Sequence, residues 1–187
     1  MKYIIYLTII LGLAITGYAG YEIYQTNKKS DQTTVLAKKI VEANDELEDE
    51  NTFTPTIGEA IGLLELPKID AELAIVEGTD PDDLEKGVGH FKESYLPRQG
   101  GQIVLSGHRD TVFKRVGELQ LGDLLTVKMP YGDNSYEIVE TKIVDADDLS
   151  IITLQNSKEE LILTTCYPFG YIGNAPQRYI IYANPIE

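Results

Sequence analysis

The sequence predicts an all-β domain, a sandwich or a barrel with short helices, preceded by a transmembrane helix. From Gly58 onward the chain divides into short runs of strand-forming residues, and prolines fall at the ends of these runs or between them. The helix is predicted by a separate observation, since no charged residue lies between Lys2 and Glu22. The length of 187 residues suits one ordinary domain with a modest extension.

Composition and charge narrow the classes of function. Hydrophobic residues make up 43% of the chain, which is enough to bury a core. The formal net charge is −14, so we expect no nucleic-acid partner, because binding to phosphates needs a basic surface. The single cysteine, Cys166, cannot form an internal disulfide or a cysteine-based zinc site. The only histidines are His90 and His108, so cysteine–histidine chemistry has two possible assignments.

Residues 1–24 are predicted to form a short cytoplasmic tip and a transmembrane anchor. The apolar stretch from Tyr3 to Tyr21 has 19 residues. As a helix this stretch would span about 28 Å, close to the thickness of the hydrocarbon core. A cleaved signal peptide is the alternative, but residues 18–20 make a poor cleavage site. We therefore expect a single-pass protein of the cell membrane with an extracytoplasmic domain.

Residues 25–57 are predicted to form an extracytoplasmic linker. Val35, Leu36, Ile40 and Val41 recur at helical spacing, which indicates one amphipathic helix in the linker. A solvated stalk without such a helix is an equal alternative for this polar segment.

Residues 58–187 are predicted to form the β domain. Within it, Asp80 and Pro81 are typical of a helix start, with Asp80 as the N-cap and Pro81 at the first helical position. Seven runs are expected to form strands, namely Ala60–Leu66, Leu73–Val76, Gln102–Ser106, Asp123–Met129, Ser135–Val144, Leu161–Thr165 and Arg178–Ala183.

Two residues at the ends of predicted strands are candidates for chemistry. Cys166 ends an apolar strand and is followed by Tyr167 and Pro168. Because proline cannot continue a central ladder, the strand must stop near the thiol, which then faces a loop. His108 follows another strand through Gly107, which permits a sharp turn. Taken alone, each residue is more often structural, as a small core cysteine or a hydrogen-bonded histidine.

A third candidate, Arg178, opens the last predicted strand and shares a face with Ile180 and Tyr182. The loop between Cys166 and Arg178 has eleven residues, 167–177. If the two strands pair as an antiparallel hairpin, the cysteine and the arginine lie opposite each other at its mouth. The alternative is a surface arginine that only closes the hairpin.

Together the three residues would make a coherent site for acyl transfer. The thiolate of Cys166 is the nucleophile. The imidazolium of His108 can protonate a leaving amine, and the neutral imidazole can deprotonate an incoming one. Arg178 keeps its proton, and its donors suit the oxyanion of a tetrahedral intermediate or the carbonyl groups of a substrate.

These residues resemble the sortases, membrane-anchored cysteine transpeptidases of Gram-positive bacteria. The family's Thr-Leu-x-Thr-Cys pattern appears as ILTTC at 162–166, with isoleucine in place of the first threonine. The histidine motif matches SGHR at 106–109, and the arginine motif matches RYIIYA at 178–183. The resemblance covers about residues 58–187. The runs HRDT and CYP are most similar to class D, while a second hydrophobic span and a lid motif typical of class C are not seen.

The resemblance implies a closed eight-stranded β-barrel, one strand more than the seven runs above. It implies that Cys166 is the nucleophile, His108 the acid and base, and Arg178 the group that orients the oxyanion or the substrate, with a structural role for His90. The implied reaction cleaves surface proteins after the threonine of an LPxTG- or LPxTA-like sorting signal. A thioacyl enzyme then transfers the protein to an amine of a peptidoglycan precursor of the lipid II type.

Three further residues are expected to bind substrate. Thr165 and Tyr167 flank the nucleophile, and Ile151 lies on the loop 145–157, which should form a wall of the cleft. Packing of a short helix is an equal alternative for Ile151. We expect no cofactor and no metal, because the acidic residues near this loop also fit a solvated surface, although some class A sortases bind calcium there. Two other functions stay open: a thiol hydrolase of the same peptides, and a membrane-tethered β-domain that binds peptides without turnover.

Overall fold

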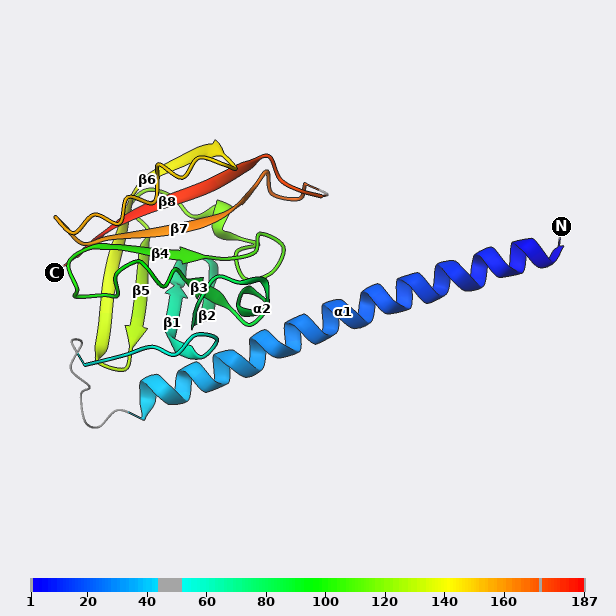
Figure 1. Cartoon of the computed structure of the whole chain (residues 1–187), viewed down its shortest axis with the longest axis horizontal. Coiled ribbons are helices and arrows are strands. Elements are labelled where there is room, and N and C mark those ends of the chain that lie inside the picture. The colour runs from blue at the N-terminus through cyan, green and yellow to red at the C-terminus, as the bar shows by residue number, and fades with distance from the viewer. Residues whose placement is uncertain (1, 44–51, 172, 187) are drawn as a thin grey trace.

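The computed structural model describes residues 2–43, 52–171 and 173–186. Eight strands form a closed barrel in the order β1-β2-β3-β4-β7-β8-β6-β5, and one long helix extends away from it (Figure 1). The elements in chain order are α1 (Lys2–Glu42), β1 (Ala60–Leu66), the 3-10 helix η1 (Pro67–Ile69), β2 (Ala71–Glu77), α2 (Pro81–Leu84), β3 (Val88–His90), β4 (Gln102–Ser106), the 3-10 helix η2 (Val116–Glu118), β5 (Leu124–Met129), β6 (Gly132–Asp145), β7 (Glu160–Tyr167) and β8 (Gln177–Pro185). The expected eight-stranded barrel with few helices is confirmed.

All seven predicted runs form strands, and the eighth strand is β3, which we did not predict from its own residues. β3 has only three residues, and it pairs in parallel with β2 and antiparallel with β4. Its middle residue is Gly89, where a Cβ atom would collide with the carbonyl oxygen of Gly78. Because close packing of backbones demands glycine here, the segment lacks the alternating pattern by which the other strands were found.

The barrel interior is filled by alternate side chains of the strands. Large residues that are fully or almost fully buried include Leu64, Ile75, Leu105, Leu125 and Leu163, and all belong to one continuous core cluster. Neighbouring residues on the same strands face outward. Burial of this apolar surface is the main force that closes the sheet, at about 25 cal/mol per Å² removed from water.

Helix α1 runs without a break from the apolar N-terminal stretch onto the outside of the barrel (Figure 1). Among the described residues it is the one helix long and apolar enough to cross a membrane. Near its end, Ala37 is completely buried against Leu63 and Ala74, which point outward from β1 and β2. Two ion pairs, Lys29–Glu85 at 2.7 Å and Lys38–Glu72, also join the helix to the barrel. Part of the predicted linker, residues 44–51, lies outside the described residues.

Candidate active site

Cys166 is the second-last residue of β7, which ends at Tyr167 just before Pro168. Its thiol is free and partly exposed. In the antiparallel ladder between β7 and β8, Cys166 pairs directly with Arg178. Cβ atoms of directly paired residues lie about 4.5–5.5 Å apart on the same face of a sheet. The hairpin therefore places Cys166 and Arg178 side by side, in the register expected if the two strands pair.

His108 reaches the same end of the barrel from β4. β4 runs parallel to β7, and the last pair of their ladder is Ser106 with Thr164. Cys166 lies two residues beyond Thr164 on β7, and His108 lies two residues beyond Ser106, just past the end of β4. Both backbone polar groups of the intervening Gly107 are hydrogen-bonded to β7. Its N–H donates to the Thr164 carbonyl at 3.1 Å, and its carbonyl accepts the Thr165 hydroxyl at 2.7 Å.

The three side chains share one end of adjacent strands but are not joined by hydrogen bonds. Across the described residues, no hydrogen bond links the thiol of Cys166 to the imidazole of His108, which is exposed to solvent. Nη1 of Arg178 donates to the carbonyls of Ala175 at 3.3 Å and Gln177 at 2.9 Å. The thiol is thus partly exposed and the imidazole exposed, so both can be reached from solvent.

Thr165 and Tyr167, expected to bind substrate, alternate with Cys166 along β7, so their side chains lie on the opposite face of the strand. Thr165 is 4% exposed, and its hydroxyl holds Gly107. Tyr167 stacks on Tyr179 with ring centroids 6.1 Å apart and meets the edge of Phe169 at 5.6 Å. The structure thus gives both residues partners within the protein, and their contact with substrate stays a prediction.

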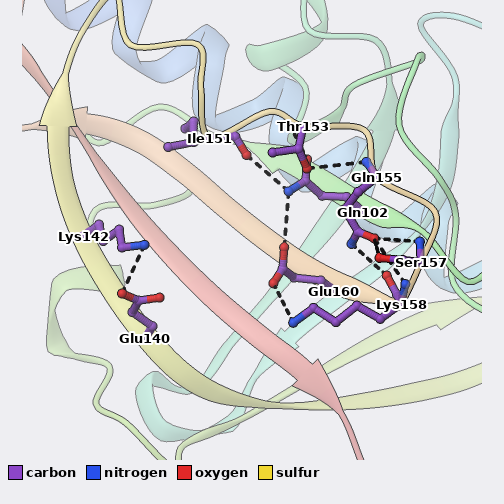
Figure 2. A network of polar contacts seen from close by, with 9 residues as sticks. All are labelled: Gln102, Glu140, Lys142, Ile151, Thr153, Gln155, Ser157, Lys158 and Glu160. Carbon is purple, nitrogen blue, oxygen red and sulfur yellow. Dashed lines mark hydrogen bonds and ion pairs between the residues drawn. The ribbon is translucent and has the colours of Figure 1, made fainter.

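Ile151 lies on the loop between β6 and β7, where Gln102 organises the backbone (Figure 2). The Gln102 amide nitrogen donates to the Ile151 carbonyl and to Glu160, both at 3.2 Å. Its amide oxygen accepts from the backbone N–H of Thr153 at 2.8 Å. Because Gln102 pairs with Glu160 at the start of β7, this anchor lies at the opposite end of that strand from Cys166. A contact between Ile151 and substrate stays a prediction.

His90 lies on β3 and is 2% exposed. Its Nδ1 is 2.7 Å from a carboxylate oxygen of Glu77, which is also buried. Its Nε2 lies 3.0 Å from both the Tyr95 carbonyl and the Ser94 hydroxyl. Both ring nitrogens are therefore engaged inside the barrel wall, in contrast to the exposed ring of His108.

Acidic residues near the β6–β7 loop are engaged with protein groups. Glu159 accepts the Tyr136 hydroxyl at 2.7 Å and the backbone N–H of Arg98 at 2.8 Å. Asp148 accepts the Ser150 hydroxyl and backbone N–H, and these hydrogen bonds hold the pKa of its carboxyl below the usual value. Within the described residues, no group of three or more His, Cys, Asp or Glu is placed to hold a metal ion.

Two buried polar residues were not singled out from the sequence, one near Cys166 and one at the other end of β7. Gln102 is a buried amide at the first position of an apolar strand, and its isolation among hydrophobic residues is a usable signal. Arg109 is 8% exposed and donates to the carbonyls of Tyr171 and Gly173. Arg109 belongs to the SGHR motif at 106–109, but no role was assigned to it from the sequence.

Comparison with known proteins shows the family of this chain. The model of the sortase domain family matches residues 64–186. The chain is similar to Sortase D of Bacillus subtilis (strain 168), at 59% identity over the full length of both chains. It is also similar to Sortase A of Bacillus anthracis, at 21% identity over 94% of this chain and 89% of that protein.

Solved structures show the same likeness. A Sortase D5 transpeptidase from Clostridium perfringens superposes with a TM-score of 0.75 at 25% identity, covering 86% of this chain and 99% of the other. Sortase C1 from Streptococcus agalactiae has a TM-score of 0.64 at 26% identity, covering 81% of this chain and 77% of the other. With the family model spanning well over half of its residues, the chain belongs to the sortases, cysteine transpeptidases, and within them to class D.

Proposed function

We propose that this sortase cleaves an LPxT-like sorting signal after its threonine and transfers the threonine carbonyl to an amine of a peptidoglycan precursor of the lipid II type. In this proposal Cys166 is the nucleophile, His108 the acid and base, and Arg178 the oxyanion donor. The observation that carries the proposal is the register that pairs Cys166 with Arg178 and ends β4 beside them.

The first half of the reaction uses all three side chains. The Cys166 thiolate attacks the threonine carbonyl carbon, and the oxygen of the tetrahedral intermediate takes up the negative charge. Arg178 donates to this oxyanion through N–H groups that remain after Nη1 has bound the loop. The His108 imidazolium gives its proton to the nitrogen of the next residue, the C–N bond breaks, and a thioester to Cys166 remains.

The second half reverses the proton transfer. The incoming amine attacks the thioester carbonyl while neutral His108 takes a proton from its nitrogen. The Cys166–carbon bond then breaks, the sulfur leaves as thiolate, and an amide is formed. A hydrolase would follow the same path with water in place of the amine, so the two functions differ only in the nucleophile of this step.

We further propose that α1 anchors the enzyme as a single-pass protein with the barrel on the extracytoplasmic side. The side chains of its N-terminal half, including Leu7, Leu11 and Ile15, are more than half exposed and have no protein surface to cover them among the described residues. A bilayer would remove this apolar surface from water. The anchor would thus hold the barrel near membrane-bound substrates.

Peptide cleavage by the full chain in detergent micelles tests the function. LPxTG and LPxTA peptides are incubated with and without an amine, either triglycine or diaminopimelate, and products are identified by mass spectrometry. We expect cleavage after threonine, an amide product when an amine is present, and loss of both with Cys166→Ala. If neither peptide is cut, or if the alanine variant cuts equally well, the proposal fails; an acid product alone identifies a hydrolase.

A second pair of variants tests the role of the arginine. Arg178→Ala should lower kcat/KM by roughly 100-fold or more, as expected when a donor to the oxyanion is lost. Arg115→Ala removes an equal charge at an exposed position, where the guanidinium pairs with Glu118, and should leave kcat/KM unchanged. Equal losses in both variants would show that Arg178 acts only through the net charge of the protein.

A further inference from the structure

Arg109, the residue after His108, is buried although it is charged. Its side chain is only 7% exposed. Charged side chains are seldom buried to this degree unless their partners lie in a fixed place. The hydrogen-bond partners of Arg109 therefore indicate the role of this residue.

These partners belong to the loop that follows the cysteine. Nη2 of Arg109 donates to the carbonyl of Tyr171 at 2.6 Å and to that of Gly173 at 2.9 Å. The guanidinium carbon also lies 6.0 Å from the centroid of the Tyr171 ring, a distance that suits a cation–π contact. One side chain thus connects the segment that carries His108 to the loop between Cys166 and Arg178.

Arg178 binds the next part of the same loop. Its Nη1 donates to the carbonyls of Ala175 and Gln177, which continue the alternation begun by the two carbonyls that Arg109 holds. Two guanidinium groups therefore fix four alternate carbonyls of one loop. The place of the Arg178 guanidinium depends on this loop, and the loop depends on Arg109.

One nitrogen of the Arg109 guanidinium group is not satisfied. Its Nε is buried and has no hydrogen-bond partner among the described residues. An oxygen of Asp110 lies 3.5 Å from this nitrogen but outside hydrogen-bonding geometry, on a side chain that is 70% exposed. A buried donor without an acceptor lowers the stability of the folded protein. Arg109 occupies this position despite that loss, and it joins two segments of the site.

We propose that Arg109 is a positioning residue for transpeptidation. It holds the segment of His108 against the loop of the β7–β8 hairpin, and so fixes the imidazole relative to the thiol and to the Arg178 guanidinium. The inference rests on the proposed function, in which these three groups act together. It adds a fourth residue to that site, one that does not touch the reacting atoms.

Arg98 provides a matched control for Arg109. Its guanidinium also donates to two backbone carbonyls, those of Tyr131 at 2.8 Å and Asp133 at 3.4 Å, and lies 5.8 Å from the Tyr131 ring centroid. Arg98 precedes β4, whereas Arg109 follows it, so the two arginines make similar contacts near opposite ends of that strand. Arg98 differs from Arg109 in being exposed, and its Nε also donates to Asn134 at 2.9 Å. Arg98→Ala therefore reports how the loss of a similar set of contacts at the surface, away from Cys166, changes stability and activity.

The test compares Arg109→Ala, Arg109→Lys and Arg98→Ala in the full chain by three measurements: thermal unfolding, kcat and KM for peptide cleavage, and the rate of Cys166 alkylation by iodoacetamide between about pH 5 and pH 9. His108→Ala is included in the alkylation measurement as a reference. We expect Arg109→Ala to stay folded but to unfold at a lower temperature than Arg98→Ala, because the contacts of Arg109 are buried. We expect its kcat alone to fall, by about 100-fold, with KM changed by less than about threefold. Its alkylation profile should match that of His108→Ala. Arg109→Lys should restore little of the kcat, because lysine lacks the planar guanidinium group with its paired N–H donors.

Two results would overturn the inference. One is an alkylation profile of Arg109→Ala that superimposes on the wild-type profile while kcat falls no further than in Arg98→Ala. The other is loss of the folded barrel in both Arg109 variants, which would make the residue a stabilising one only. Alkylation needs no substrate, so if the wild-type enzyme cuts no peptide, the proposed function fails while the profiles still decide the role of Arg109.

Discussion

At the scale of single residues, burial decides how much a polar contact contributes. His90 and Glu77 are both almost completely buried and contact each other at 2.7 Å, whereas Arg115 and Glu118 make a similar contact with more than half of each side chain exposed. Water screens the second pair, and the side chains lose entropy in forming it. The first pair lies in the protein interior, where the dielectric constant is low. Removal of one partner there leaves the other buried and unpaired, which destabilises the fold.

His90→Phe should therefore destabilise the barrel by about 3–5 kcal/mol, because Glu77 stays buried without its partner. Urea unfolding followed by circular dichroism measures the change. Glu118→Ala serves as the control at the exposed pair and should leave the free energy of unfolding unchanged. A double variant, Glu77→Leu with His90→Phe, should recover part of the loss; if it is less stable than His90→Phe, unpaired burial is not the cause.

Tyr136 predicts how stability depends on alkaline pH. Its burial, and then its hydrogen bond to Glu159, raise the pKa of Tyr136 far above the ordinary value of about 10. Above that pH the unfolded chain loses this proton while the folded chain keeps it, so the free energy of unfolding should fall by about 1.4 kcal/mol per pH unit from this group. Below about pH 10 the group should contribute no slope.

Tyr136→Phe removes this titration. Unfolding in urea between pH 9 and 11, roughly the range in which tyrosine ionises, should show a shallower decline for the variant. At neutral pH the same variant should be less stable by about 1.5–3 kcal/mol, because Glu159 loses a donor. An equally steep alkaline decline in both proteins would show that other groups titrate.

At the scale of elements, the β6–β7 loop depends on one side chain. Gln102 is 1% exposed, and its side chain makes four hydrogen bonds to the loop and to the start of β7 (Figure 2). The loop has little regular structure of its own, so these bonds substitute for a ladder. Glu140 and Lys142, in the same view, form an ion pair at 3.1 Å with both side chains about half exposed.

Gln102→Leu should detach the loop, since the backbone N–H groups of Thr153 and Leu154 lose their acceptor. We expect a loss of about 3 kcal/mol in stability and faster cleavage within residues 146–159 by added protease. Glu140→Ala, the control, should alter neither measurement. Equal protease sensitivity in all three proteins would show that the loop is held by other contacts.

The elements also show how far sequence reasoning reaches. The long strands were predictable because alternation and flanking prolines are local signals, and the length of the loop from Cys166 to Arg178 indicated the hairpin register that the structure has. β3 was not predictable, because its three residues are specified by the strands on either side. The contacts of Arg109 were hidden for a similar reason, since its acceptors lie more than sixty residues away in sequence.

At the scale of the whole molecule, the main question is how firmly α1 is joined to the barrel. The contact is small but specific: Ala37 is buried between outward-facing residues of β1 and β2, and Lys29 and Lys38 pair with Glu85 and Glu72. The small side chain of Ala37 lets the helix approach the strands closely. Any larger residue there would have to displace the helix.

Ala37→Phe should therefore separate α1 from the barrel, at a cost of about 1–3 kcal/mol to the docked state. Hydrogen exchange in micelles should become faster in α1 after residue 29, while cleavage of soluble peptides stays at the wild-type rate. Val35→Phe adds a larger aromatic side chain on the same helix at an exposed position and should change neither. Slower peptide cleavage in the Ala37 variant would show that docking also shapes the active site.

Because α1 is one continuous helix, it fixes the distance between the membrane and the barrel. If residues 3–21 cross the bilayer as proposed, the ion pair of Lys29 with Glu85 comes eight residues later, about 12 Å further along the helix axis. The continuous helix would then hold the barrel directly above the lipid headgroups, whereas a long flexible linker would let it move away from the membrane. A rigid connection of this kind restricts the active site to a narrow range of distances from the membrane. Only surface proteins and wall precursors held at that distance would reach the active site.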